Sequence, residues 1–134
     1  MVCKEWEQLI KETLDECLQP VFVLVFGSHA KGIARNNSDL DLAYFSVKKI
    51  TNYQRFLLVG DLSEKCNVEV DLINLREIDT VFAAQIFSTG ELLYCTDENV
   101  FIRERMKAYS MYATLNEQRA DILHGIEKRG GIYG

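Results

Sequence analysis

Residues Val21 to Phe45 have the sequence VFVLVFGSHAKGIARNNSDLDLAYF, and this stretch decides the fold. It begins with six apolar residues, rich in valine and phenylalanine, and ends that run with a glycine, which predicts a buried strand. A second run, Asp39 to Phe45, predicts another strand. Because side chains two apart on a strand share a face, we expect Asp39 and Asp41 to point the same way, about 7 Å apart at the backbone. The leucines that alternate with them would point into a core.

The two carboxylates and the Gly27-Ser28 pair before them have the chemistry of a nucleotide site. Neighbouring carboxylates repel each other unless a cation lies between them. Mg²⁺ suits that position, because it binds one or two carboxylates and completes its shell with water and substrate phosphates. Gly27 allows the backbone to approach a ligand closely, and the Ser28 hydroxyl adds a donor. A short helix expected from about Ala30 would point its free N–H groups at phosphate.

A second phosphate motif is excluded. Gly27 and Gly32 have the GxxxxG spacing of a Walker loop. That loop continues with Lys and then Ser or Thr, which reach the terminal phosphates and the metal. Ile33-Ala34 stands there instead, so the sequence does not predict a Walker loop.

The order of these residues resembles the signature of the DNA polymerase β-like nucleotidyltransferases. Gly27-Ser28 is followed after ten residues by Asp39-Leu40-Asp41. The signature implies a third acid on a later strand, and Asp71 matches its position. Glu69 would share the face of Asp71 and is the other candidate. Within the superfamily, the short chain is similar to the minimal nucleotidyltransferases, which are the antitoxins of HEPN/MNT toxin–antitoxin pairs.

The resemblance implies a complete set of site residues. It makes Asp39, Asp41 and Asp71 both the catalytic residues and the ligands of Mg²⁺, with two ions about 3.5–4 Å apart. The residues expected to contact the ATP substrate are Gly27, Ser28, Lys31 and Ser38. An Arg is common in the family where Lys31 stands; Lys keeps the charge and loses the planar fork. The Ser38 side chain is expected either to form a hydrogen bond with a carboxylate or to cap a turn.

The resemblance also implies a reaction and a partner. The reaction is transfer of AMP from ATP to a tyrosine hydroxyl of a cognate HEPN toxin, a helical RNase, with which the chain would form a hetero-oligomer. Two alternatives stay open: an antitoxin that masks the toxin by binding alone, and an enzyme that nucleotidylates a small molecule such as an aminoglycoside. The second alternative normally requires an added acceptor-binding domain, for which this chain leaves little length.

The bulk properties limit the remaining classes. A chain of 134 residues suits a single domain, 1–134. A net charge of −5 argues against a nucleic-acid groove, which needs a basic patch. The four cysteines contain no CxxC pair and form no zinc pattern with the two histidines. The charged N-terminus is unlike a signal peptide, and no apolar run approaches the ~20 residues of a membrane span, so a cytoplasmic protein is expected.

The rest of the pattern predicts an α/β fold, a small mixed sheet with flanking helices. Strands are expected over 68–74 and 91–95. Helices are expected over 4–18, over 52–66, from the N-cap Asp79 to Gly90, and over 97–128 as a long C-terminal helix. The helix over 52–66 would be a crossover, which favours parallel pairing of the strands that it joins.

The end of the chain has its own expectations. The glycine-rich tail, 129–134, should fray. The second half of the last helix, 116–128, alternates charged and apolar residues and is expected to project from the domain, either as a solvated helix end or as a docking face. The candidate for docking a partner is the whole helix from Glu98 to Lys128, with Tyr112, Leu115, Ile122 and Ile126 as candidate contacts.

Overall fold

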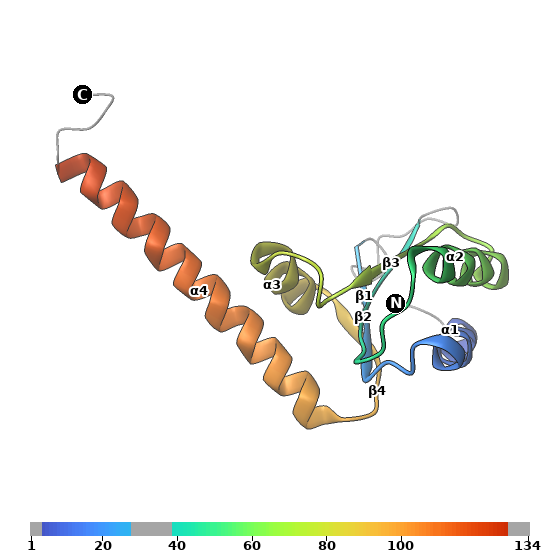
Figure 1. Ribbon diagram of the computed structural model, residues 1–134. Coiled ribbons are helices and arrows are strands. Elements are labelled where there is room, and N and C mark those ends of the chain that lie inside the picture. The colour runs from blue at the N-terminus through green and yellow to red at the C-terminus, as the bar shows by residue number, and fades with distance from the viewer. Residues whose placement is uncertain (1–3, 28–38, 129–134) are drawn as a thin grey trace.

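The computed structural model describes residues 4–27 and 39–128, with the side chains of the last helix described as far as Ala120. Four helices and four strands follow one another along this part of the chain (Figure 1). Their bounds are α1 (Lys4–Cys17), β1 (Phe22–Phe26), β2 (Leu40–Phe45), α2 (Asn52–Cys66), β3 (Val70–Asn74), α3 (Thr80–Thr89), β4 (Glu91–Cys95) and α4 (Glu98–Lys128).

The four strands form one mixed sheet in the order β3-β2-β1-β4. β1 is antiparallel to both of its neighbours, and the pairing of β1 with β4 shifts register between Val23 and Leu24. β2 and β3 are parallel, which confirms the crossover predicted for α2. The sequence prediction of an α/β fold with a small mixed sheet is therefore confirmed.

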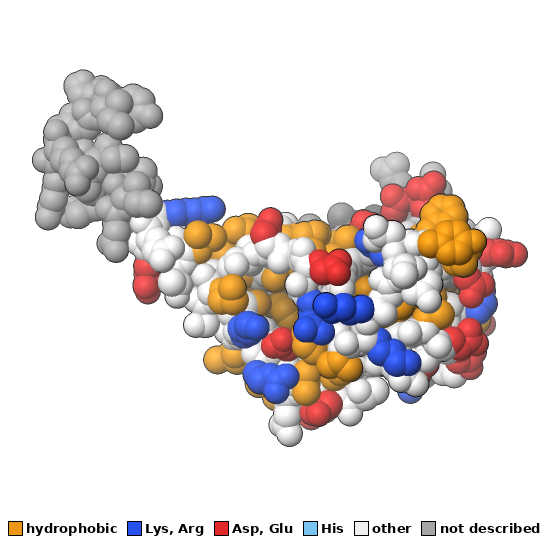
Figure 2. All heavy atoms as spheres, in the orientation of Figure 1, with side chains coloured by type: hydrophobic (Ala, Val, Ile, Leu, Met, Phe, Trp, Pro, Cys, Tyr) orange, Lys and Arg blue, Asp and Glu red, His pale blue; other side chains and the backbone are white. Residues whose placement is uncertain are grey.

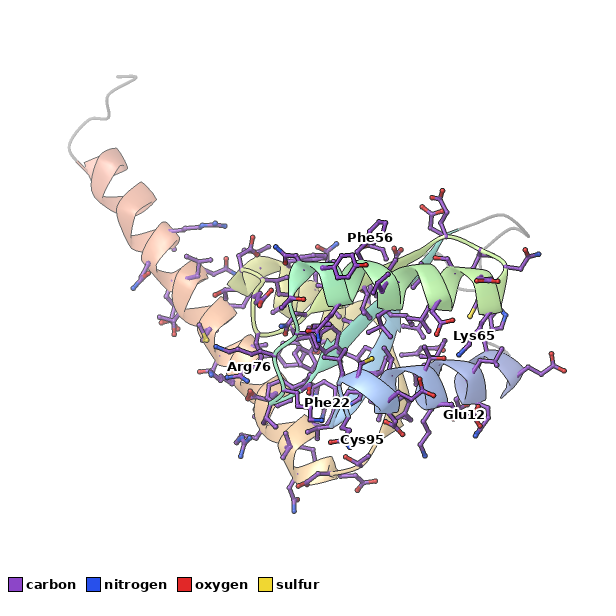
Figure 3. The ribbon with its side chains drawn as sticks, turned by 45° about the vertical axis from the view of Figure 1, so that its right-hand side comes forward. Glu12, Phe22, Phe56, Lys65, Arg76 and Cys95 are labelled. Atoms are coloured by element: carbon purple, nitrogen blue, oxygen red, sulfur yellow. The ribbon has the colours of Figure 1, made fainter. Side chains whose placement is uncertain are left out.

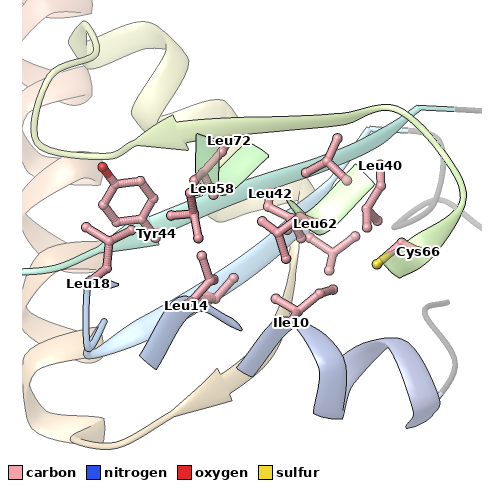
Figure 4. Packing of buried hydrophobic residues seen from close by; sticks show 13 residues of the cluster. Ile10, Leu14, Leu18, Leu40, Leu42, Tyr44, Leu58, Leu62, Cys66 and Leu72 are labelled. Carbon is pink, nitrogen blue, oxygen red and sulfur yellow. The ribbon is translucent and has the colours of Figure 1, made fainter. Parts of the chain in front are cut away.

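The helices cover both faces of the sheet (Figure 1). α1 and α2 pack on one face, where alternate residues of β1, β2 and β3 point. Figure 4 shows this core from close by, with Tyr44, Leu42 and Leu40 of β2 facing the helices. Its buried members are Ile10, Leu14, Leu18, Val23, Val25, Leu40, Leu42, Tyr44, Leu58, Leu62, Cys66, Val70 and Leu72. Each such side chain contributes roughly 1.5–3 kcal/mol through removal from water.

α3 and the first turns of α4 pack on the opposite face. Phe22 is central here: its ring stacks on Phe45 at 5.3 Å between centroids and meets the edge of Phe101 at 5.0 Å. Figure 3 labels Phe22 beside α4. Because these rings come from β1, β2 and α4, they fix the start of α4 to the sheet.

Local signals set several element ends. Thr51 and Gln54 form a reciprocal capping box at the start of α2. The Asp79 side chain accepts a hydrogen bond from Phe82 N at 2.7 Å, which confirms the predicted N-cap of α3. Gly90 ends that helix, and its N–H donates to Ile86 O at 2.8 Å. The Asp97 carboxylate accepts from Asn99 N at 3.0 Å and so caps α4.

α4 continues beyond the rest of the domain. Figure 1 shows it leaving the sheet and α3 behind as it runs toward the C-terminus. The side chains from Asn116 to Ala120 are all exposed. This agrees with the predicted projection of the second half of the helix. Among the helices that the structure describes, none has the length and apolar character needed to cross a membrane.

Candidate active site

Asp41 and Asp71 lie side by side on the sheet. β2 and β3 are parallel, and Asp41 is the register partner of Asp71. Register partners on neighbouring strands are about 4.8 Å apart and point to the same face. The alternation of buried residues puts that face toward α3, since Ala43 and Ile73, two residues further along, pack in the α3 core. Asp41 is partly buried and Asp71 is exposed.

Gly27 contacts the Asp41 carboxylate from the end of β1. Its φ is +74°, in the left-handed region that favours glycine. A Cβ built on Gly27 would lie 2.2 Å from Asp41 Oδ2, far closer than any real contact. The backbone at the end of β1 therefore lies against one of the acids, and only glycine leaves room for that carboxylate. The sequence predicted a close backbone approach at Gly27, but toward phosphate, and did not predict this contact.

Asp39 and Glu69 directly precede β2 and β3, and β3 begins two residues later than expected. Asp39 is exposed and lies one residue before β2, so the strand begins one residue later than expected. Glu69 is exposed and directly precedes β3, and its carbonyl oxygen accepts a hydrogen bond from Leu40 N at 2.8 Å. Asp39 therefore stands two residues before Asp41, and Glu69 two residues before Asp71.

An aromatic pair borders the acids on the α3 side. Phe26 is the antiparallel partner of Asp41 in β1 and shares the face of the acids. Its ring lies 5.9 Å from that of Phe82 in α3, edge to face at 83°. Neither ring was predicted from the sequence to border the site. The signal was available, because Phe26 is the last residue of the apolar run before the Gly-Ser pair.

Several predicted contacts lie outside the described residues. These are Ser28, Lys31 and Ser38, together with the short helix expected from about Ala30. Of the residues expected to contact nucleotide, the structure describes Gly27 alone, at the end of β1.

The donor set suits a divalent ion that arrives with its nucleotide. Within residues 4–27 and 39–128, no three acidic, histidine or cysteine side chains gather closely enough to hold a metal ion. The structure does bring two carboxylates, Asp41 and Asp71, to adjacent register positions. Mg²⁺ binds through one or two carboxylates and takes its other ligands from water and phosphate, so this pair matches its requirements.

Comparison with known proteins agrees with this reading. Residues 8–99 match the family model described as polymerase beta, nucleotidyltransferase. The chain is 30% identical over 121 residues to a protein adenylyltransferase, MntA, of Shewanella oneidensis, an alignment that covers 89% of this chain and 85% of MntA.

Solved structures resemble the fold over most of its length. One is a crystal structure of a toxin–antitoxin with AMP-PNP, with a TM-score of 0.77, 28% identity, and coverage of 90% of this chain and 98% of the other. Another is the toxin–antitoxin MntA–HepT, with a TM-score of 0.72, 25% identity, and coverage of 91% and 97%. From the family match over residues 8–99 and the fold, the chain belongs to the polymerase β nucleotidyltransferase family.

Proposed function

We propose that this chain is a Mg²⁺-dependent adenylyltransferase antitoxin, which transfers AMP from ATP to a tyrosine hydroxyl of a cognate HEPN toxin. The observation that carries the proposal is the in-register pair Asp41 and Asp71, with the Gly27 backbone against Asp41. The relative that is 30% identical is a protein adenylyltransferase, and a similar solved structure is a toxin–antitoxin with AMP-PNP. Together they favour AMP as the transferred group and a protein as the acceptor.

The reaction is an in-line displacement at the α-phosphorus of ATP. The acceptor oxygen forms a new bond to that phosphorus, the bond from the phosphorus to the bridging oxygen breaks, and pyrophosphate leaves. The acceptor hydroxyl loses its proton, and Asp71 is the proposed base, because its exposed carboxylate lies where an acceptor can approach. Asp41 lies against the Gly27 backbone and is the more buried of the two acids.

Asp39, Asp41 and Asp71 are the proposed holders of Mg²⁺. When bound, Mg²⁺ would neutralise charge that develops on the attacking oxygen of the acceptor and on the leaving oxygen of pyrophosphate. Gly27, Ser28, Lys31 and Ser38 remain the proposed contacts to the nucleotide. Gly27 would contribute to both the metal site and the nucleotide site. It directly follows β1 and lies beside Asp41, and in the sequence it precedes Ser28, Lys31 and Ser38.

The test is to mix the purified chain and toxin with ATP and Mg²⁺ and to weigh the toxin intact. Wild type should add whole AMP units to the toxin. Asp41→Asn should add none, because it removes one ligand charge. A melting curve of Asp41→Asn is the control for folding. If the variant transfers AMP at the wild-type rate, the site assignment is wrong. If it neutralises the toxin fully with no mass gain, the chain acts as an antitoxin that masks by binding.

A further inference from the structure

A groove lies at the far end of the sheet from the acids. Its volume is about 530 Å³, and it runs between α4, the start of α3 and the segments that follow β2 and β3. The acids lie at the start of β2 and β3, whereas the groove begins where these strands end, at Phe45 and Leu75. Asp41 and Asp71 lie four residues before Phe45 and Leu75, so roughly 13 Å of strand separates the two places. The groove is thus a concave surface that contains none of the acids of the active site.

The floor of the groove is apolar, and its apolar surface continues outward over the rim. Phe45, Ile78 and Phe87 belong to its lining. On the rim, Val47 is 75% exposed and Met111 is 49% exposed. Large apolar side chains left in water beside an apolar hollow are typical of a surface that a partner covers. Because the apolar area continues beyond the hollow, it suits a segment of a larger molecule better than a small ligand.

Cationic side chains outnumber acidic ones on the rim, although the whole chain is acidic. Arg76, Arg103 and Lys107 line the groove, while the acids on it are Asp79 and Glu104. The Asp79 carboxylate is already bound to the first turn of α3 through Phe82 N. Among the described side chains, the one salt bridge joins Lys65 and Asp61, so Arg103 and Lys107 have no carboxylate partner there.

The cations come from two parts of the chain that the fold brings together. Arg103 and Lys107 are four residues apart, on one side of α4. Arg76 follows β3, and its guanidinium donates to Ser46 O at 3.3 Å, which holds it at the groove. Figure 3 shows Arg76 next to α4. Figure 2 shows Lys and Arg side chains gathered among hydrophobic ones over the first half of α4 and beside it.

We infer that this groove docks an acidic segment of the toxin that carries an apolar anchor residue. The basic rim is complementary to acidic side chains, and the apolar floor takes the anchor. The inference rests on the proposed function for the identity of the partner. Docking at a distance from the acids would keep the toxin bound while its tyrosine enters and leaves the active site. The local concentration of the acceptor hydroxyl at the acids would rise as a result.

The test is calorimetric titration of the purified HEPN toxin into this chain, with no nucleotide present. Lys107→Glu should weaken binding at least tenfold, and Met111→Ser several-fold. The matched control is Lys11→Glu, an equal charge change at an exposed lysine of α1, on the other face of the sheet. It should change the affinity less than twofold. The difference between the two lysine variants should shrink in high salt, because salt screens exposed charges.

The same variants separate docking from catalysis. In the AMP-transfer assay, Lys107→Glu should raise the KM for toxin and leave kcat at saturating toxin unchanged. If wild type transfers AMP while Lys107→Glu and Lys11→Glu bind equally well, the docking inference is wrong and the proposed function stands. If wild type binds without transferring AMP and Lys107→Glu weakens binding, docking stands and the proposed function fails. A dimer of this chain that Lys107→Glu dissociates, with toxin affinity unchanged, would assign the groove to a second copy and overturn the inference.

Discussion

Oδ2 of Asp41 occupies the space where a side chain on Gly27 would begin. Gly27 directly follows Phe26, which is the antiparallel partner of Asp41, and its φ is +74°. The position of the Asp41 carboxylate in the proposed metal site thus requires that residue 27 has no side chain. Substitution at Gly27 should act on the chemistry through Asp41 before it acts on the fold.

Gly27→Ala tests this dependence. An alanine must both adopt a left-handed backbone, at a cost of roughly 1–2 kcal/mol, and displace the carboxylate that lies 2.2 Å from its Cβ. We expect AMP transfer to fall at least tenfold and nucleotide affinity to fall with it, while the protein stays folded. Calorimetry with ATP and Mg²⁺, beside a melting curve, measures both. Wild-type affinity in a folded variant would contradict the contact.

Gly60 offers the opposite case. It lies in the interior of α2, and a Cβ there would meet nothing within 4 Å. Gly60→Ala should stabilise the protein by about 0.5–1 kcal/mol, because alanine loses less backbone entropy in a helix. The control is Gly90→Ala, whose Cβ would lie 2.6 Å from Ile86 O and 3.0 Å from Val25 O. It should lower the melting temperature, so the two substitutions should shift thermal unfolding in opposite directions.

The third acid can be assigned by comparing Asp71 with Glu69. Asp71 is in register with Asp41, whereas Glu69 precedes β3 and holds Leu40 N through its backbone. Asp71→Asn should reduce transfer on the order of 100-fold, as expected for loss of the proposed general base. Glu69→Gln should keep activity within about twofold of wild type, as a variant without a catalytic contact. Intact-mass time courses measure both. The reverse ranking would move the third acid to Glu69.

Tyr94 makes stability depend on pH in the alkaline range. Burial raises the pKa of its hydroxyl, and Asp15 raises it further. The unfolded chain releases this proton near pH 10 while the folded protein keeps it, so stability should fall as the pH rises above about 10. Burial also raises the pKa of Tyr44, which adds to the same slope.

Tyr94→Phe isolates that contribution. The Tyr94 hydroxyl is buried and, among the described side chains, has no hydrogen-bond partner. Its removal should raise stability at neutral pH by about 1 kcal/mol and flatten the fall above pH 10. Urea unfolding at pH 7 and pH 10.5 measures both effects. The control is Tyr53→Phe, at a residue that is 69% exposed, which should change neither. An unchanged alkaline slope in Tyr94→Phe would show that the burial of this hydroxyl is not its cause.

The two ends of α3 were the most predictable element borders in this chain, because local groups set them. Asp79 and Gly90 limit α3 through their own hydrogen bonds, and both were predicted from residue type and position. The parallel pairing of β2 and β3 followed from a connection long enough for a helix. The family signature supplied Asp71, and the structure brings it beside Asp41.

Features that depend on packing between distant segments could not be predicted. The sequence does not say that β4 lies beside β1, or that the acids face α3 instead of α2. Glycine at position 27 permits a positive φ without requiring it, so its contact with Asp41 had no signal of its own. The groove brings Arg76 beside Arg103 and Lys107, although Arg76 is far from both of them in the sequence. The acidic total charge gave no indication of this cationic cluster.

The length of α4 has a consequence for how this protein unfolds. Its first turns are fixed to the sheet through Phe101, whereas its side chains from Asn116 to Ala120 are exposed. A helix without tertiary contacts is marginal in water and opens at little cost in free energy. In hydrogen exchange, the opening free energy of amides near Phe101 should equal the global free energy of unfolding. The opening free energy of amides beyond Asn116 should be much smaller. Deletion of the residues after Gln118 should leave the melting temperature unchanged. α4 is then one helix but two thermodynamic units, and a partner that binds its free half would supply the stability that this half lacks.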